Sequence, residues 1–319
     1  METNMLPMTI GDIFDEAFDL YKHNFALLAG IVALVHVPAE IGFSLLFLSF
    51  HLDPSSIYAN QTNDVSYVIG FMIAWMIVLI IWSFLFVMQN SALTIAISEK
   101  YLGKNISIGG AYRRSLPFFW KLNVTWGIIS LAMLALVFIL SPVFSFIVAI
   151  AAPFAINQNN PSIAPVVIIT SIFLSIISLA SMVLLVLMGL FITQIVVVEG
   201  KSSIQSIQRN FQLILGRFWR VIGFTVLLSL IVLALSIAFM GTLSATLDLL
   251  IFQWVNFSQL IQDITNDVLF TLIWMFIQPF WMICLTLLYY DHRVRTEGFD
   301  LSLLDKQMAG NFVKTVSSK

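Results

Sequence analysis

Six long apolar stretches dominate this sequence. They lie near residues 25–50, 67–98, 118–155, 164–198, 218–247 and 268–290. Each is longer than the roughly 20 residues that an α-helix needs to cross a bilayer. Only 10% of the residues are charged and the mean hydropathy is +0.97, whereas a soluble domain has about 25% charged residues. The chain is therefore predicted to be an all-α, polytopic membrane protein with six transmembrane helices.

The positive charges lie on one side of this predicted bundle. All 15 lysines and arginines come before the first apolar stretch, between the second and third, between the fourth and fifth, or after the sixth. The three other connections contain none, and these are residues 51–66, 156–163 and 248–267. Because short basic loops stay in the cytoplasm, both termini are expected to be cytoplasmic, in the inner or plasma membrane of the cell. The acidic first 22 residues are unlike a signal peptide, so the first stretch is expected to remain in the protein.

A short amphipathic segment precedes every second apolar stretch. These segments are residues 9–25, 106–121 and 199–220, and they align when one aromatic residue of each is placed in register, namely Phe25, Trp120 and Trp219. A repeated pattern of this length indicates an internal duplication. We therefore predict one membrane domain of three helical hairpins, each preceded by a cytoplasmic interfacial amphipathic helix. The predicted pseudo-repeats are residues 9–100, 106–200 and 203–297, followed by a cytoplasmic tail at 298–319.

The three amphipathic segments differ in charge. The first is acidic, and the second and third are basic. One interpretation is that the acidic helix packs beside the basic ones and closes a ring under the bundle. The other is that the basic helices bind anionic lipid headgroups, at about 1 kcal/mol per charge near the surface. The sequence leaves both interpretations open.

Glu40 is the only acidic residue well inside a predicted span, and His36 lies four residues before it. Residues four apart share a face of a helix. An ionisable group inside a membrane is costly and marks a candidate functional site. Pro38 lies between the two and is a likely site for a helix break. In the alternative interpretation the helix ends there, and Glu40 reaches water among the outer headgroups.

Uncharged polar residues extend this candidate site. The fourth span has serines at helical spacing, for which close helix packing is favoured over a polar pathway. Two of them, Ser178 and Ser181, are included because Ser181 lies at a depth similar to that of Glu40. Gln89 and Gln278 also lie within spans, where every amide must find a partner inside the bundle. The candidate ligand-binding residues are therefore Glu40, His36, Ser178, Ser181, Gln89 and Gln278.

No motif in the sequence indicates catalysis or a metal site. There is no HExxH, no GxSxG, no phosphate-binding loop and no Cys/His cluster with metal-ligand spacing. The chain is therefore predicted to be no enzyme and to need no metal or cofactor. Its basic residues are confined to one membrane face, which argues against nucleic acid as a partner. Membrane lipids are the expected partners, with a protein at the cytoplasmic face as a further candidate.

Three segments resemble one family of bacterial and archaeal multi-pass proteins. They are TIGDIFDEAFDLYKHNF at 9–25, SIQSIQRNFQLILGRFWRVIG at 203–223 and YYDHRVRTEGFDLSLL at 289–304. The chain resembles the membrane region that is fused to some glycerophosphoryl diester phosphodiesterases, and its stand-alone relatives. In the fused enzymes the chemistry belongs to a separate soluble barrel with its own metal-binding residues, which this chain lacks. The resemblance therefore implies the membrane fold and a relation to lipids, and no phosphodiesterase activity.

Two functions follow as hypotheses. The leading one is a non-enzymatic protein that binds, passes or organises a lipid-like or other amphiphilic molecule within the bundle. The alternative is a structural or accessory subunit that recruits or stabilises a partner protein or a separately encoded enzyme. Binding of a defined lipid that depends on Glu40 would favour the first, and copurification of a polypeptide would favour the second.

Overall fold

The computed structural model describes residues 7–49, 65–156, 183–184, 186–247, 249 and 259–298, and these residues form helices joined by short turns. Five of the helices are long and apolar enough to cross a membrane, and a sixth span results if the bent pair Val186–Glu199 and Ser203–Gly216 is counted as one. The prediction of an all-α protein is thereby confirmed for the described residues, and several of its helices are long and apolar enough to cross a membrane. The chain divides into two compact units, one formed by Met1–Phe119 with Gly216–Lys319 and the other by Trp120–Leu215.

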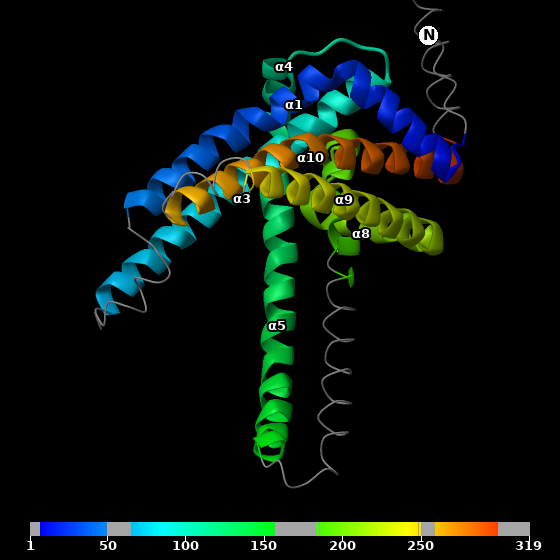
Figure 1. Ribbon diagram of the computed structural model, residues 1–319. Coiled ribbons are helices and arrows are strands. Elements are labelled where there is room, and N and C mark those ends of the chain that lie inside the picture. Colours follow the sequence, from blue (N-terminus) through cyan, green and yellow to red (C-terminus); the bar gives the residue numbers. More distant parts are fainter. Residues whose placement is uncertain are drawn as a thin grey trace, which may run out of the picture. The chain divides into compact units, whose positions relative to one another are not determined.

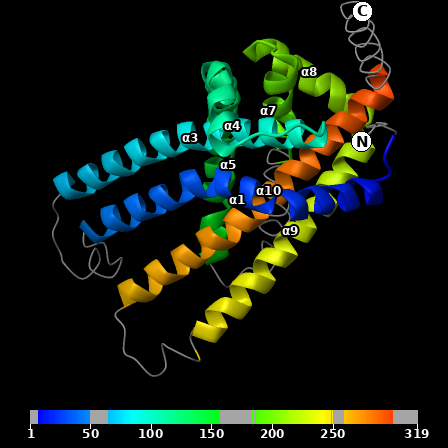
Figure 2. The same ribbon diagram turned by 90° about the horizontal axis from the view of Figure 1, so that it is seen from above.

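The first unit is a layer of long helices. It contains α1 (Ile10–Ser49), α3 (Val65–Tyr101), α4 (Ile108–Ser115), α9 (Phe218–Leu247) and α10 (Gln259–Glu297). Helix α1 packs between α3 and α10, and α9 packs on the other side of α10 (Figures 1 and 2). The neighbours α1 and α10 come from opposite ends of the chain, so this unit is complete only when its first and last helices meet.

The buried core of this unit lies toward the ends of the spans that carry the basic residues. Fully buried side chains gather there, including Leu28, Ile31, Leu93, Ile97 and Tyr289. In the N-terminal half of α3, at the opposite end of the unit, apolar residues are exposed instead, including Met72, Ile73, Met76 and Ile77. A helix that shows apolar side chains on most of its surface is suited to a lipid environment. The tight packing of this unit is therefore concentrated at one end of the bundle.

The N-terminal part of α1 is set apart from its membrane span. Its first turn forms a capping box, in which the Thr9 amide donates to Asp12 Oδ2 at 2.7 Å and the Asp12 amide donates to Thr9 Oγ1 at 3.2 Å. The helix is interrupted at Asn24, where φ is −124°. No such interruption occurs at Pro38, so the alternative in which the helix ends there is wrong. His36 and Glu40 therefore lie on one continuous helix.

Helix α4 is a short segment fixed to α1. Ser107 caps its N-terminus by accepting from the Gly110 amide, and the Tyr112 hydroxyl donates to the Ile31 carbonyl at 2.7 Å. Gly30 of α1 leaves room for Ile108 at the start of α4, because a Cβ atom at Gly30 would lie 2.7 Å from Ile108 Cδ1. A turn of 3₁₀ helix, η1 (Leu116–Phe118), then separates α4 from the next long helix.

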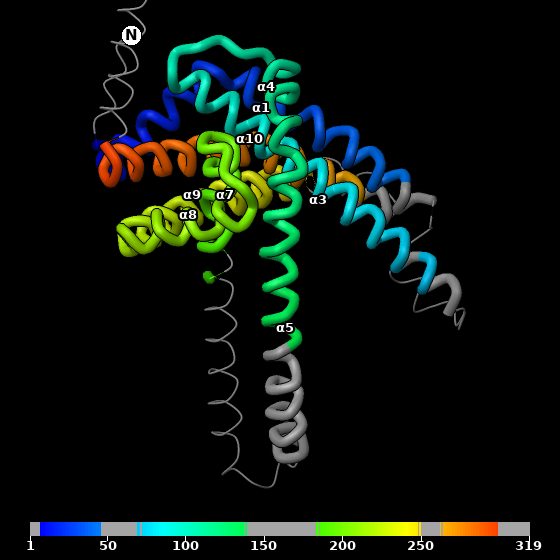
Figure 3. Tube along the Cα trace, turned by 180° about the vertical axis from the view of Figure 1, so that it is seen from behind, coloured from blue at the N-terminus to red at the C-terminus, as the bar shows by residue number. Residues whose placement is uncertain are grey.

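The second unit contains α5 (Phe119–Ile156), α7 (Ile192–Gln194), the π-helix η2 (Ile195–Glu199) and α8 (Ser203–Gly216) (Figure 3). The chain turns through 118° between η2 and α8, at Gly200, whose φ of +68° favours glycine. Lys121 donates from Nζ to the Gly200 carbonyl at 3.2 Å, and the Ser203 hydroxyl donates to the Lys121 carbonyl at 3.2 Å. These bonds tie the turn to the start of α5.

Candidate functional site

The structure places four of the six predicted site residues in the first unit. His36 and Glu40 are on α1, Gln89 is on α3, and Gln278 is on α10. The remaining two, Ser178 and Ser181, lie outside the described residues. The geometry of the site is therefore that of the α1–α3–α10 contact.

Two glutamines connect α3 and α10 inside the bundle. Gln89 donates from Nε2 to Gln278 Oε1 at 3.0 Å, and Gln278 donates from Nε2 to Asn90 Oδ1 at 3.0 Å. Both glutamines are buried. Amides in an apolar interior need such partners, because each buried polar group without a hydrogen bond destabilises the folded protein by about 1–3 kcal/mol. The interhelical bonding expected for these residues is present.

His36 lies beside this pair of glutamines. Its side chain is buried, and Nδ1 lies 3.3 Å from the Val32 carbonyl one helix turn earlier. The ring meets Trp82 edge to face, with centroids 5.1 Å apart. The Nε2 atom of His36 and the Oε1 atom of Gln89 are both enclosed within the bundle, and the two side chains interact. The imidazole is therefore part of the same polar cluster as the two glutamines.

Glu40 extends from the same face of α1, one turn farther along. Its Oε2 accepts from the Thr271 hydroxyl of α10 at 2.7 Å, and its side chain is half-buried. Thr271 was not singled out from the sequence, where one threonine in an apolar span gives no signal. The carboxylate is therefore held in a fixed position between α1 and α10.

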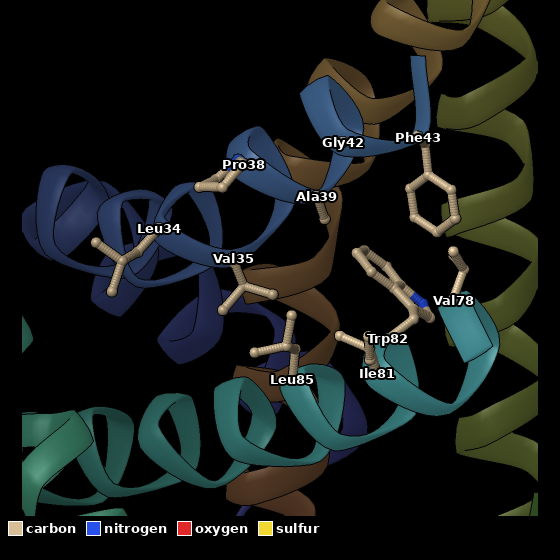
Figure 4. A pocket seen from close by; sticks show the side chains of 10 residues that line it. All are labelled: Leu34, Val35, Pro38, Ala39, Gly42, Phe43, Val78, Ile81, Trp82 and Leu85. Atoms are coloured by element: carbon tan, nitrogen blue, oxygen red, sulfur yellow. The ribbon is translucent and has the colours of Figure 1, made fainter. Parts of the chain in front are cut away.

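An apolar groove of about 420 Å³ lies between α1 and α3 (Figure 4). Its walls are mainly apolar, and Pro38, Ala39 and Gly42 of α1 leave the space that larger side chains would fill. Trp82 stands on the α3 side and contacts both His36 and Phe43. The groove thus begins next to the polar residues of the site. The sequence signal that could have located it is the set of small residues after Pro38.

A buried ion cluster lies at the basic end of the first unit. The Asp291 carboxylate accepts from Arg220 Nη2 at 2.8 Å, from Arg295 Nε at 2.9 Å and from the Met8 amide at 2.8 Å. Both arginines also donate to the Met8 carbonyl, each at 2.6 Å. The chain just before α1 is therefore fixed through the backbone of Met8. This cluster was not predicted from the sequence.

The second unit contains a break in its return helix. Around Leu190 the helix is interrupted, and Asn210 of α8 forms hydrogen bonds with backbone groups at the interruption. It accepts from the Phe191 amide at 3.0 Å and donates to the Leu187 and Met188 carbonyls at 2.8 and 3.1 Å. One side chain thus replaces the hydrogen bonds that the helix lacks. Gln194 follows, buried, and its amide has no hydrogen-bond partner among the described residues.

Within the described ranges, no three His, Cys, Asp or Glu side chains lie close enough together to hold a metal ion. Comparison with known proteins finds no matching protein-family model, no matching curated protein and no matching solved structure. The resemblance to the phosphodiesterase-associated membrane region therefore stays a prediction, and function has to be inferred from the site itself.

Proposed function

We propose that this chain is a six-span membrane protein built from three hairpins, each preceded by an amphipathic helix at the cytoplasmic surface. The helix breaks support this arrangement, since each amphipathic segment is separated from the following span, at Asn24, at Leu116–Phe118 and after Gly216. With basic loops inside, both termini lie in the cytoplasm of a cell-membrane protein. A cysteine at Ser202 should react with a membrane-impermeant maleimide only after the cells are opened.

The inner ends of the return helices support the threefold repeat. Each ends at a glycine in the left-handed conformation, and these are Gly103, Gly200 and Gly298. Before each glycine a buried threonine is followed by an acid, in the pairs Thr94 and Glu99, Thr193 and Glu199, and Thr286 and Asp291. The spacing is one residue longer in the second pair, where the π-helix η2 accommodates one additional residue.

Two of these acids pair with the amphipathic segment that follows them. Glu99 pairs with Arg114 at 3.2 Å, and Glu199 pairs with Arg209 at 3.2 Å. Asp291 instead pairs with Arg220 of the third segment at 2.8 Å and accepts from the amide of Met8, the residue just before the first segment. The contact with Met8 supports a series of repeats that closes on its first member.

We propose that the protein is not an enzyme and that it binds, passes or organises a lipid-like or other amphiphilic molecule in the bundle. The observation that carries this function is the groove between α1 and α3, which has apolar walls and begins beside His36 and Gln89. An amphiphile needs both parts, because apolar walls bury its chain and a few placed polar groups orient its head.

The test is native mass spectrometry of the protein released gently from its own membrane. Leu in place of Gly42 would fill the groove, and a Cβ atom at Gly42 meets no other atom within 4 Å, so the variant should fold. The matched control is Gly223→Leu on α9, where a Cβ atom also meets nothing within 4 Å. We expect a defined amphiphile on the wild type and on the control, and its loss from Gly42→Leu. Equal retention by all three would refute the site, and a copurifying polypeptide would favour the accessory-subunit function.

A further inference from the structure

The charges around the groove indicate which class of amphiphile it takes. We propose, building on the function above, that the occupant is a cationic amphiphile, an alkyl chain that carries an ammonium group. The ammonium group would lie between Glu40 and the aromatic side chains of Phe43, Trp75 and Trp82. The chain would occupy the groove between α1 and α3.

Glu40 sets the sign of the charge. Among the described residues of the first unit it is the only Asp, Glu, Lys or Arg in the segments 26–49, 65–98, 221–247 and 268–290. Its Oε2 accepts from Thr271, and no described residue donates to Oε1. A carboxylate in apolar surroundings is stabilised by an opposite charge. An anionic head would meet this carboxylate with no basic residue near it.

The aromatic residues provide the second contact that an ammonium group uses. Phe43 is three residues after Glu40 on α1, and its ring centroid lies 5.9 Å from that of Trp75 and 5.7 Å from that of Trp82. Rings attract cations over their faces, and clusters of rings are a common binding site for quaternary ammonium groups. The Trp82 ring also lines the groove, so a head held here leaves its chain beside the groove walls.

Photolabelling with probes of matched chain length tests the inference. The protein is placed in nanodiscs of phosphatidylcholine and exposed to three amphiphiles with the same diazirine-bearing chain, which end in trimethylammonium, sulfonate or maltoside. Mass spectrometry then locates the label. We expect the ammonium probe to label residues 34–43 and 78–85 at least about tenfold more than the sulfonate probe, the size of effect that a desolvated cation–aromatic contact provides.

Two substitutions at Glu40 separate charge from packing. Glu40→Gln keeps the side-chain length and should lower labelling by the ammonium probe about tenfold, whereas Glu40→Asp should retain most of it. The control is Asp15→Asn, which makes the same charge change at the far end of α1, and it should change labelling less than twofold. Thermal melting of each variant checks that it is folded.

The possible outcomes distinguish this inference from the function on which it rests. Equal labelling of the groove by all three probes would overturn the cationic class and leave amphiphile binding intact. An equal loss in Glu40→Gln and Glu40→Asp would assign Glu40 only to its bond with Thr271, and it would overturn the inference as well. No labelling of the groove by any probe would refute the proposed function itself.

Discussion

Removal of the Asp291 side chain should destabilise the first unit more than removal of any other acid at its basic end. The carboxylate is fully buried, and it joins two arginines to the backbone of Met8. Breaking a buried ion pair by removing one partner costs about 3–5 kcal/mol, because the other charge stays without compensation. Here the arginine side chains are 21% and 20% exposed, so they regain some hydration. We therefore expect Asp291→Ala to lower the free energy of unfolding by about 3 kcal/mol.

The assay is reversible unfolding in mixed micelles, with Glu297→Ala as the control. Glu297 pairs with Arg293 one turn away on the same helix at 3.1 Å, and its own side chain is 29% exposed, whereas that of Asp291 is fully buried. An i,i+4 pair on one helix contributes about 0.5 kcal/mol. Adding Arg220→Ala to Asp291→Ala should cost little more, because it removes a charge that the first substitution leaves uncompensated. A loss in Asp291→Ala no larger than that in Glu297→Ala would refute the buried cluster.

Three further predictions concern the second unit. Gly189→Ala would place a Cβ atom 2.6 Å from Trp126 Cη2, so the free energy of unfolding, measured by thermal melting, should fall by about 1–3 kcal/mol. Adding Trp126→Leu should restore part of this stability, because it removes the atom that the new Cβ meets. Asn210→Leu would remove the three hydrogen bonds that join α8 to the interrupted helix. The free energy of unfolding should fall by about 1–3 kcal/mol for each buried backbone group that loses its partner, and hydrogen exchange should rise at residues 187–191. Gly200→Ala would force a side chain into a φ of +68°, which should lower the melting temperature by the equivalent of about 1–2 kcal/mol.

Much of the architecture could be predicted because the membrane imposes simple rules. Spans follow from the length of apolar stretches, and Gln89 and Gln278 were expected to bond across helices because an apolar interior offers an amide no water. His36 and Glu40 could be placed on one helix face from their spacing alone. Their connection to Thr271 and Trp82 could not, since it depends on the rotation of α3 and α10 about their own axes.

Other features depend on contacts over long distances in the chain. Met8 and Asp291 are 283 residues apart, and no local pattern links an exposed N-terminal turn to an acid in a basic segment. Proline indicated a break at Pro38, but the packing of α1 against α3 and α10 keeps the helix intact there. The interruption near Leu190 had one weak signal, Gly189, and the residue that supports it, Asn210, lies in a different helix.

The discontinuous first unit has a consequence for biosynthesis. Helix α1 leaves the ribosome first and α10 last, and the whole second unit is made between them. Until α10 is inserted, Gln89 lacks its partner Gln278 and Glu40 lacks Thr271. Before α10 is inserted, these polar groups of α1 and α3 must therefore face lipid or an insertion factor. A nascent chain stalled before Gln259 should depend on such a factor for its lifetime, whereas the finished protein shields these groups itself.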